Sequence, residues 1–231
     1  MLNENSFILI TGAKGFVGKN LVCQLKNLGF TNLALFDVDS TDEDLQNYVK
    51  KAEFVFHLAG VNRPVDNGEF YTGNADLTQK IITILEENNN NCPLLISSSV
   101  QAQLDNDYGK SKKMAEDAVF AHEDKTGAIA YVFRLTGVFG KWCRPNYNNV
   151  IATFCANVAN GLPIEVRDPS YTFPVCYIDD VVNAFIGALK GKVMRERSRH
   201  GLCHVGIDYD VSLGFLADTI KGFANGRETL S

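Results

Sequence analysis

The segment Phe7-Ile-Leu-Ile-Thr-Gly-Ala-Lys-Gly-Phe-Val-Gly18 decides the fold that this sequence predicts. Its first four residues are apolar and read as a buried strand, and a helical stripe of apolar residues begins at Val17 and continues through Leu21 and Leu25. A strand, a glycine turn and a helix in this order commonly hold a dinucleotide pyrophosphate, because the helix N-terminus offers free amide groups and the positive end of its dipole.

The three glycines of this segment follow a Gly-x-x-Gly-x-x-Gly spacing, which is looser than the Gly-x-Gly-x-x-Gly fingerprint. Glycine at these positions would permit a sharp turn, a close approach of the backbone to phosphate, and tight packing of the helix on the strand. The residues expected to contact the coenzyme here are Gly12, Lys14, Gly15, Phe16, Val17 and Gly18.

Short apolar runs alternate with helical segments along the first 134 residues. The runs are typical of parallel strands that are buried on both faces. The pattern predicts an α/β fold, a doubly wound parallel sheet of the Rossmann type, with ligand bound at the carboxyl ends of the strands. Strands are expected at Phe7–Ile10, Leu33–Phe36, Phe54–Leu58, Leu94–Ser97 and Ile129–Arg134, and helices near 16–28, 42–51, 74–87 and 108–121.

The alternation weakens after Arg134. Residues 137–149 are rich in Gly, Asn, Pro and aromatics and read as a loop. We expect helices near 150–160 and 180–190, a short strand at Ile164–Val166, a solvated loop over Lys190–His200, and a helical stripe toward the end. The chain is therefore predicted to be one domain over 1–231, with a coenzyme part at about 1–134 and a small substrate-binding lobe at about 135–231.

Composition excludes several classes of function. The chain has 231 residues, of which 45% are hydrophobic, and its net charge of −5 argues against a general nucleic-acid partner. The apolar run at Phe7–Ile10 is too short for a signal peptide or a membrane span, so a cytoplasmic location is expected. The six cysteines show no C-x-x-C spacing, which favours reduced, mostly buried thiols and predicts no metal site.

The string Tyr108-Gly-Lys-Ser-Lys112 supplies a candidate acid. On a helix, Tyr108 and Lys112 are four residues apart and share one face. An adjacent ammonium favours the ionised form of a phenol, so the pair is a candidate proton donor or acceptor near neutral pH. The same spacing also occurs in ordinary solvated pairs, and the upstream glycine turn is what favours chemistry.

These residues resemble the extended short-chain dehydrogenase/reductase superfamily over nearly the whole chain. The resemblance rests on the glycine turn, the Tyr-x-x-x-Lys pair, and Ser97-Ser-Ser99 at the end of the fourth strand. It implies that Ser99, Tyr108 and Lys112 are catalytic, and that Tyr108 and Lys112 also bind the coenzyme. It further implies coenzyme contacts at Leu58, Ala59, Gly60 and Asn74, and it extends to Tyr177-Ile-Asp-Asp180, a segment similar to one in nucleotide-sugar enzymes.

Longer strings, such as His57-Leu-Ala-Gly-Val-Asn-Arg-Pro64 and Gly140–Phe154, resemble the reductase half of bifunctional capsular-polysaccharide enzymes. The resemblance implies reduction of a UDP-linked 4-keto-6-deoxy-N-acetylhexosamine on the way to UDP-N-acetyl-L-fucosamine. Those enzymes carry a cupin domain that epimerises the sugar, and this sequence has no such region. We therefore expect either a truncated chain or a homologue that reduces without epimerising.

The coenzyme choice turns on three charged residues. Asp37 and Asp39 stand at the end of the second strand, where an acidic residue accepts from the ribose of NAD and repels a 2′-phosphate. Lys14, inside the glycine turn, could instead meet that phosphate. The resemblance tips the balance, and NADP(H) is favoured narrowly over NAD(H).

The loop Lys141–Asn149 is the expected clamp on the UDP-sugar. Trp142 and Tyr147 could cover a uracil or sugar face, and Asn146, Asn149 and Arg144 could bind pyrophosphate or sugar hydroxyls. Gln101 is a further candidate for a sugar contact, although a surface position explains it equally well. Gly137 stands where the superfamily often has an asparagine that contacts the substrate.

Two other functions remain open at this point. Eight residues separate Ser99 from Tyr108, and no Asp-Glu pair follows Ser99, which argues against a dehydratase and leaves reduction or 4-epimerisation. A UDP-hexose 4-epimerase would keep NAD bound and consume none. A non-catalytic coenzyme-sensing protein would commonly lose the tyrosine or the lysine, which are both present. A homodimer is a weaker expectation of the resemblance.

Overall fold

The computed structural model describes residues 2–196, 198 and 200–228. The chain forms two compact units, one made of residues 1–135 and 182–206 and the other of residues 136–181 and 207–231, which we call the first and second units. The boundary after residue 135 lies next to the division predicted near residue 134, and residues 182–206 pack with the first unit.

A seven-stranded sheet forms the centre of the first unit, with the strand order β2-β1-β3-β4-β5-β9-β8. All adjacent strands are parallel except β8 and β9. The order reverses between β1 and β3, so the carboxyl ends of these two strands form the switch point at which ligands bind in such sheets. The strands are β1 (Ile8–Thr11), β2 (Leu33–Phe36), β3 (Phe54–His57), β4 (Leu94–Ser99), β5 (Ala130–Leu135), β8 (Met194–Arg195) and β9 (Cys203–His204).

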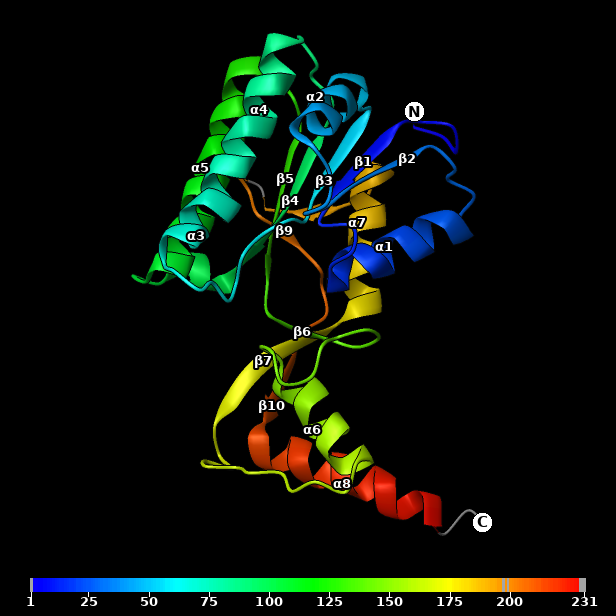
Figure 1. Cartoon of the computed structure of the whole chain (residues 1–231), viewed down its shortest axis with the longest axis vertical. Helices are drawn as coiled ribbons and strands as arrows, with labels where there is room; N and C mark the ends of the chain where they lie inside the picture. The colour runs from blue at the N-terminus through cyan, green and yellow to red at the C-terminus, as the bar shows by residue number, and fades with distance from the viewer. Residues whose placement is uncertain (1, 197, 199, 229–231) are drawn as a thin grey trace. The chain divides into compact units, whose positions relative to one another are not determined.

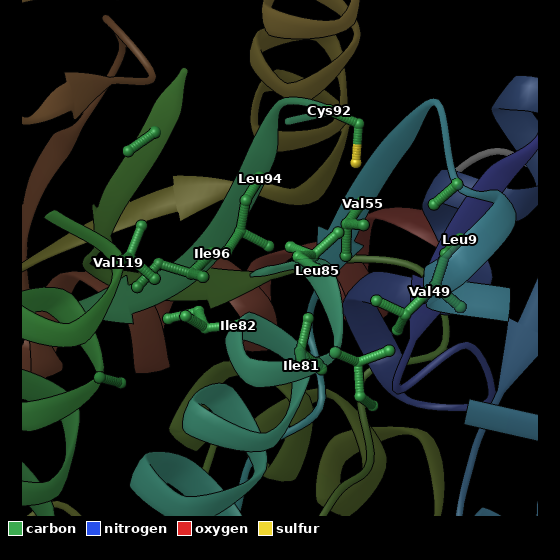
Figure 2. Close-up of a cluster of buried hydrophobic side chains, with 14 of the residues drawn as sticks. Leu9, Val49, Val55, Ile81, Ile82, Leu85, Cys92, Leu94, Ile96 and Val119 are labelled. Carbon is green, nitrogen blue, oxygen red and sulfur yellow. The ribbon is translucent and has the colours of Figure 1, made fainter. Parts of the chain in front are cut away.

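Helices cover both faces of this sheet (Figure 1). On one face, helices α2 (Asp42–Lys51), α4 (Leu77–Glu87) and α5 (Asp107–Thr126) pack their apolar sides on alternate residues of the strands. Figure 2 shows this cluster, in which Leu9 and Val55 from the strands meet Ile81 and Leu85 from α4. The fold class predicted from the sequence is thereby confirmed.

The other face is aromatic where α7 (Ile178–Leu189) meets the sheet. Phe185 lies with its ring centroid 5.0 Å from that of Phe133 and 6.4 Å from that of Phe56. Helix α1 (Phe16–Asn27) buries Leu21 and Leu25 on the same face, beside β1. Because helices cover both faces of the sheet, the strands from β1 to β5 are mostly apolar, and polar residues stand mainly at their carboxyl ends.

Three short turns complete the first unit: α3 (Gly68–Phe70), the π-helical turn η1 (Tyr71–Asp76) and the 3₁₀ turn η2 (Val100–Gln103). The turn η1 leads directly into α4, and η2 connects β4 to the start of α5. Each of these turns borders residues of the candidate site.

The second unit is a three-stranded sheet with two helices. Its strands are β6 (Gly137–Phe139), β7 (Thr172–Tyr177) and β10 (Tyr209–Ser212), in the order β10-β7-β6, and its helices are α6 (Val150–Ala159) and α8 (Leu213–Glu228). Phe154 of α6 and Leu216, Ala217 and Ile220 of α8 form its buried cluster.

Two expectations for the region after Arg134 are wrong. Ile164–Val166 is not a strand, and Ile164 and Val166 instead pack against the apolar cluster of the second unit. The segment Lys190–His200 is not simply a solvated loop, because Met194–Arg195 forms β8 and Arg195 donates to Glu123 at 2.9 Å. Residues 197 and 199 of that segment lie outside the described residues.

The six cysteines are all unpaired, but only half of them are buried. Cys92, Cys176 and Cys203 are buried, Cys143 is intermediate, and Cys23 and Cys155 are exposed. Burial raises the pKa of Cys92 and of Cys176 to about 12 and that of Cys203 to about 11. Among the described residues, none of the helices combines the length and apolar character that crossing a bilayer requires.

Candidate active site

The glycine turn between β1 and α1 is as tight as the sequence suggested. Gly12 has φ +67°, and a Cβ on it would lie 2.7 Å from the backbone nitrogen of Ala59. The Gly15 amide donates to the Gly12 carbonyl at 3.0 Å, and a Cβ on Gly18 would collide with that same carbonyl oxygen. Glycine is therefore required at 12 for conformation and space, and at 18 for the packing of α1 on the turn.

The switch point between β1 and β3 fits a dinucleotide. Gly15 is the N-cap of α1 and has no side chain to occupy the first amides of the helix, so these amides are available to a phosphate. Phe16 and Val17 form the first turn of α1, and Leu58 is half-buried just after β3. A Cβ on Gly60 would lie 2.7 Å from Asn74 Oδ1 and 3.0 Å from Lys112 Nζ, so only glycine lets these groups approach.

The charged residues expected to compete for the coenzyme contact one another. Lys14 Nζ donates to Asp39 Oδ2 at 2.5 Å, and the Lys14 backbone amide donates to Asp37 Oδ2 at 2.7 Å. The Lys14 bond lowers the pKa of Asp39. The exposed side chains of Lys14 and Asp39 thus pair with each other, and their opposing effects on the choice of coenzyme stay a prediction.

Ser99, Tyr108 and Lys112 lie together at the carboxyl end of β4 and the start of α5. The Ser99 hydroxyl is near enough to the Tyr108 phenol to lower its pKa, and Ser99 Oγ accepts from the Gln101 backbone amide at 3.2 Å. Lys112 Nζ lies 5.9 Å from the centroid of the Tyr108 ring and donates to the Ser97 carbonyl at 3.1 Å. All three residues predicted to be catalytic are thus in one cluster.

Burial shifts the pKa of both ionisable members of this cluster. It raises the pKa of Tyr108, and the neighbouring Ser99 hydroxyl opposes that rise only in part. Burial also lowers the pKa of Lys112 to about 8, against the attraction of Glu116. The expectation that the lysine depresses the tyrosine pKa is therefore not met by the chain alone, because desolvation of the phenolate is the larger effect.

Glu116 and Arg134 form a buried ion pair one turn along α5 from Lys112, and the charge of Glu116 raises the pKa of that lysine. Glu116 is fully buried, and its carboxylate accepts two bonds from Arg134, at 2.8 Å to Nε and 2.6 Å to Nη2. Ser98 Oγ donates to the same carboxylate at 2.6 Å. Sequence reasoning missed this group, although Tyr108, Lys112 and Glu116 recur at four-residue spacing on one helix face.

Asn74, which the resemblance implied as a coenzyme contact, connects the turn after β3 to the catalytic helix. Its Oδ1 accepts from the Val61 amide at 3.0 Å, and its Nδ2 donates to the Val61 carbonyl at 2.9 Å and to Ser111 Oγ at 3.0 Å. His57, the last residue of β3, is buried.

The loop expected to clamp the substrate belongs to the second unit. Arg144 is exposed and lies over the Tyr147 ring, 5.4 Å from its centroid, and Trp142 is 57% exposed. The backbone amide of Asn146 donates to Thr153 Oγ1 at 2.9 Å. Asn149 Oδ1 accepts from the Ala152 backbone amide and caps α6, and its Nδ2 donates to the Val138 carbonyl, so both ends of its side-chain amide have partners within the fold.

The remaining substrate candidate, Gln101, is exposed on η2 in the first unit. The second unit contains a cavity of about 850 Å³ that sequence reasoning did not anticipate. Apolar side chains of β6, β7, α6 and α8 line most of it, including Phe139, Val175, Tyr177, Phe215, Leu216 and Phe223. The described residues hold no cluster of His, Cys, Asp and Glu that could bind a metal.

Comparison with known proteins identifies relatives. The model of the NAD dependent epimerase/dehydratase family matches residues 8–199. A UDP-2-acetamido-2,6-beta-L-arabino-hexul-4-ose reductase of Pseudomonas aeruginosa is 40% identical over 224 residues, which are 97% of this chain and 59% of the relative. The crystal structure of the capsular polysaccharide assembling protein CapF of Staphylococcus aureus is 38% identical with a TM-score of 0.86, and the match covers 96% of this chain and 59% of CapF.

A more distant structure shares the fold alone. WbmF of Bordetella bronchiseptica, solved with NAD+ and UDP, is 19% identical with a TM-score of 0.83, and the match covers 96% of this chain and 78% of WbmF. The chain spans 59% of the length of the Pseudomonas and Staphylococcus relatives described above. The resemblance inferred from the glycine turn and the Tyr-x-x-x-Lys pair is confirmed, and the chain belongs to the NAD dependent epimerase/dehydratase family.

Proposed function

We propose that this chain catalyses the NAD(P)H-dependent reduction of a UDP-linked 4-keto-6-deoxy-N-acetylhexosamine in the synthesis of surface-polysaccharide precursors. One observation carries the proposal: Ser99, Tyr108 and Lys112 lie together at the carboxyl end of β4 and the start of α5, next to a glycine turn that fits a dinucleotide. The name of the Pseudomonas relative, a reductase of a UDP-linked hexulose, supports the choice of substrate class.

Each catalytic side chain has a defined role in such a reduction. A bound reduced nicotinamide would supply the hydride to the carbonyl carbon. Tyr108 then donates its phenolic proton to the carbonyl oxygen, and its raised pKa keeps that proton in place at neutral pH. Ser99 orients the same oxygen, and the ammonium of Lys112 favours the phenolate that remains.

We further propose NADP(H) as the preferred coenzyme. Solvent screens an exposed ion pair strongly, so a 2′-phosphate could displace Asp39 from Lys14 at little cost. Asp37 opposes this choice, because its carboxylate is held at the end of β2, where it could accept from a ribose hydroxyl instead. The preference thus depends on whether Lys14 gains more from phosphate than from Asp39.

The activity is tested by incubating the purified chain with a UDP-4-keto-6-deoxy-N-acetylhexosamine and either NADPH or NADH. We expect loss of the reduced-nicotinamide absorbance that depends on the keto sugar, and a new C4 hydroxyl in the product by NMR. Folded chain that binds coenzyme yet reduces no 4-keto sugar would contradict the proposal. Interconversion of C4 epimers without net coenzyme oxidation would instead identify a 4-epimerase.

The proposal includes a cytoplasmic location and a homodimer. The six unpaired cysteines suit a reducing compartment. Analytical ultracentrifugation of the purified chain tests the dimer, and fractionation of cells that express it tests the location.

A further inference from the structure

Three buried side chains form a continuous hydrogen-bond chain beneath the glycine turn. The Ala59 amide donates to Thr11 Oγ1 at 3.1 Å, Thr11 Oγ1 lies 2.7 Å from His57 Nδ1, and His57 Nε2 lies 2.9 Å from Thr78 Oγ1. Thr78 Oγ1 in turn donates to the Asn74 carbonyl at 2.6 Å. Thr11, His57 and Thr78 are each at most 3% exposed, so water does not compete for these bonds.

The direction of each bond in this hydrogen-bond network follows from the Asn74 carbonyl, which is its last acceptor. A carbonyl can only accept, so the single hydroxyl proton of Thr78 goes to Asn74. Thr78 must then accept from His57, which places the imidazole proton on Nε2 and leaves Nδ1 as an acceptor. Thr11 donates to Nδ1, and its oxygen remains free to accept from the Ala59 amide.

The hydrogen-bond network continues to the catalytic helix through the side chain of Asn74. The Asn74 side chain donates to Ser111 Oγ at 3.0 Å, and Ser111 donates to the Tyr108 carbonyl at 2.8 Å. Asn74 lies in the π-helical turn η1, a distortion that often occurs at functional sites. At the other end, Ala59 is the residue against which a Cβ on Gly12 would collide. One path of bonds therefore joins the coenzyme turn to the residue proposed as the acid.

We propose that His57 is a positioning residue, held as the neutral Nε2–H tautomer, and that through Thr78 and Asn74 it couples the glycine turn to the helix of Tyr108. The inference deepens the proposed reductase function and rests on it for its biological role. Burial and the nearby charge of Lys112 lower the pKa of His57 to about 3, so the neutral form persists across the working pH range. A proton on Nδ1 would remove the acceptor for the Thr11 hydroxyl.

The tautomer is read directly by ¹⁵N NMR of the full chain labelled in histidine, with the His57 ring assigned through bonds to its own backbone. We expect a protonated Nε2, an unprotonated Nδ1, and no titration between about pH 5 and pH 9, given the lowered pKa. A proton on Nδ1, or titration in that range, would overturn the inference.

The coupling is tested with Thr78→Val and a matched control, Thr83→Val. Thr83 lies in the same helix and donates to the Gln79 carbonyl at 2.9 Å, but it is exposed and has no histidine partner. Thr78→Val should move the His57 proton to Nδ1 and raise the NADPH dissociation constant about tenfold, because the imidazole loses its acceptor. Thr83→Val should leave the tautomer unchanged and the constant within about twofold of the original.

A double-mutant cycle that combines Thr78→Val with Ser111→Ala tests whether the two side chains affect NADPH binding jointly or independently. We expect the double variant to differ from the product of the single effects on NADPH binding by at least about threefold. Independent effects, or equal effects of Thr78→Val and Thr83→Val, would overturn the coupling. Because these readouts need no sugar, they remain valid even if no 4-keto sugar is reduced, and that result would refute only the proposed function.

Discussion

Tyr108 has both a chemical and a packing neighbour, because the Ser99 hydroxyl lowers the pKa of its phenol while the centroid of its ring lies 5.5 Å from that of Phe70. Tyr108→Phe removes the donated proton and keeps the ring contact. Turnover should fall by about two orders of magnitude or more, with the NADPH dissociation constant little changed. Steady-state kinetics and a fluorescence titration measure the two effects. A variant that keeps more than about a tenth of the rate would show that another group is the acid.

Lys112 should make the stability of the coenzyme-free chain depend on pH. Its pKa is about 8 in the folded chain and 10.5 when unperturbed, so between these values the unfolded chain binds more protons at this site. The free energy of unfolding should therefore gain a rising contribution as pH increases from about 8 to about 10.

Chemical unfolding at several pH values measures this contribution. Lys112→Met should lack it, and its stability relative to the unmodified chain should decline over the same interval. Lys113→Met is the matched control, because Lys113 is exposed on the same helix and pairs with Asp117. Equal pH profiles for the two variants would show that Lys112 is not the group that titrates.

The Lys14–Asp39 pair leads to a prediction about coenzyme choice. If Lys14 binds the 2′-phosphate, Lys14→Ala should raise the NADPH dissociation constant at least about tenfold, roughly 1.4 kcal/mol, and barely affect NADH. Asp39→Ala should shift the balance toward NADPH, because it frees Lys14 and removes a repulsive charge. Titration of both coenzymes decides the question. Tighter binding of NADH by the unmodified chain would show that the strand-end carboxylates dominate.

At the scale of elements, α5 is fixed to β5 by the buried Glu116–Arg134 pair. Glu116→Gln leaves the Arg134 cation without its partner, at a side chain that is only 16% exposed. The free energy of unfolding should fall by about 3 kcal/mol, since an unpaired buried charge costs more than the pair contributes. Equilibrium denaturation measures the change.

The double variant Glu116→Gln/Arg134→Met separates the lost charge from the lost shape. Glutamine can still accept from Ser98, and methionine fills space without charge, so stability should return to within about 1 kcal/mol of the unmodified chain. If the double variant is as unstable as the single one, packing of the two side chains matters more than their charges.

The parallel strands could be predicted because each is a short apolar run with a polar end. The observed β1, β3 and β5 begin or end within a residue or two of the predicted positions, and β2 agrees at both ends. The predicted strand at Ile164–Val166 failed because apolar alternation also arises where an irregular segment covers a helical cluster. Strand β9 was missed since it forms through pairing with β5, some seventy residues earlier in the chain.

At the scale of the molecule, the parts of the site that were predicted are the parts encoded by local motifs. Ser99, Tyr108 and Lys112 follow one another within a short stretch, and the glycine turn is continuous in sequence. Arg134 and Thr78 had no such signal, because their roles depend on tertiary contacts with Glu116 and His57. The loop residues Arg144 and Asn146 lie in the second unit, and their contact with substrate stays a prediction.

The uneven exposure of the six thiols provides native attachment points for probes. Cys23 is exposed on α1 in the first unit and Cys155 on α6 in the second, whereas Cys92, Cys176 and Cys203 are buried. Because a reagent must reach the sulfur, a nitroxide reagent should label the two exposed positions before the buried ones. Each compact unit would then carry one spin label without any engineered cysteine. Pulsed electron spin resonance between the labels, with and without NADPH, would report directly whether coenzyme binding changes the separation of the units.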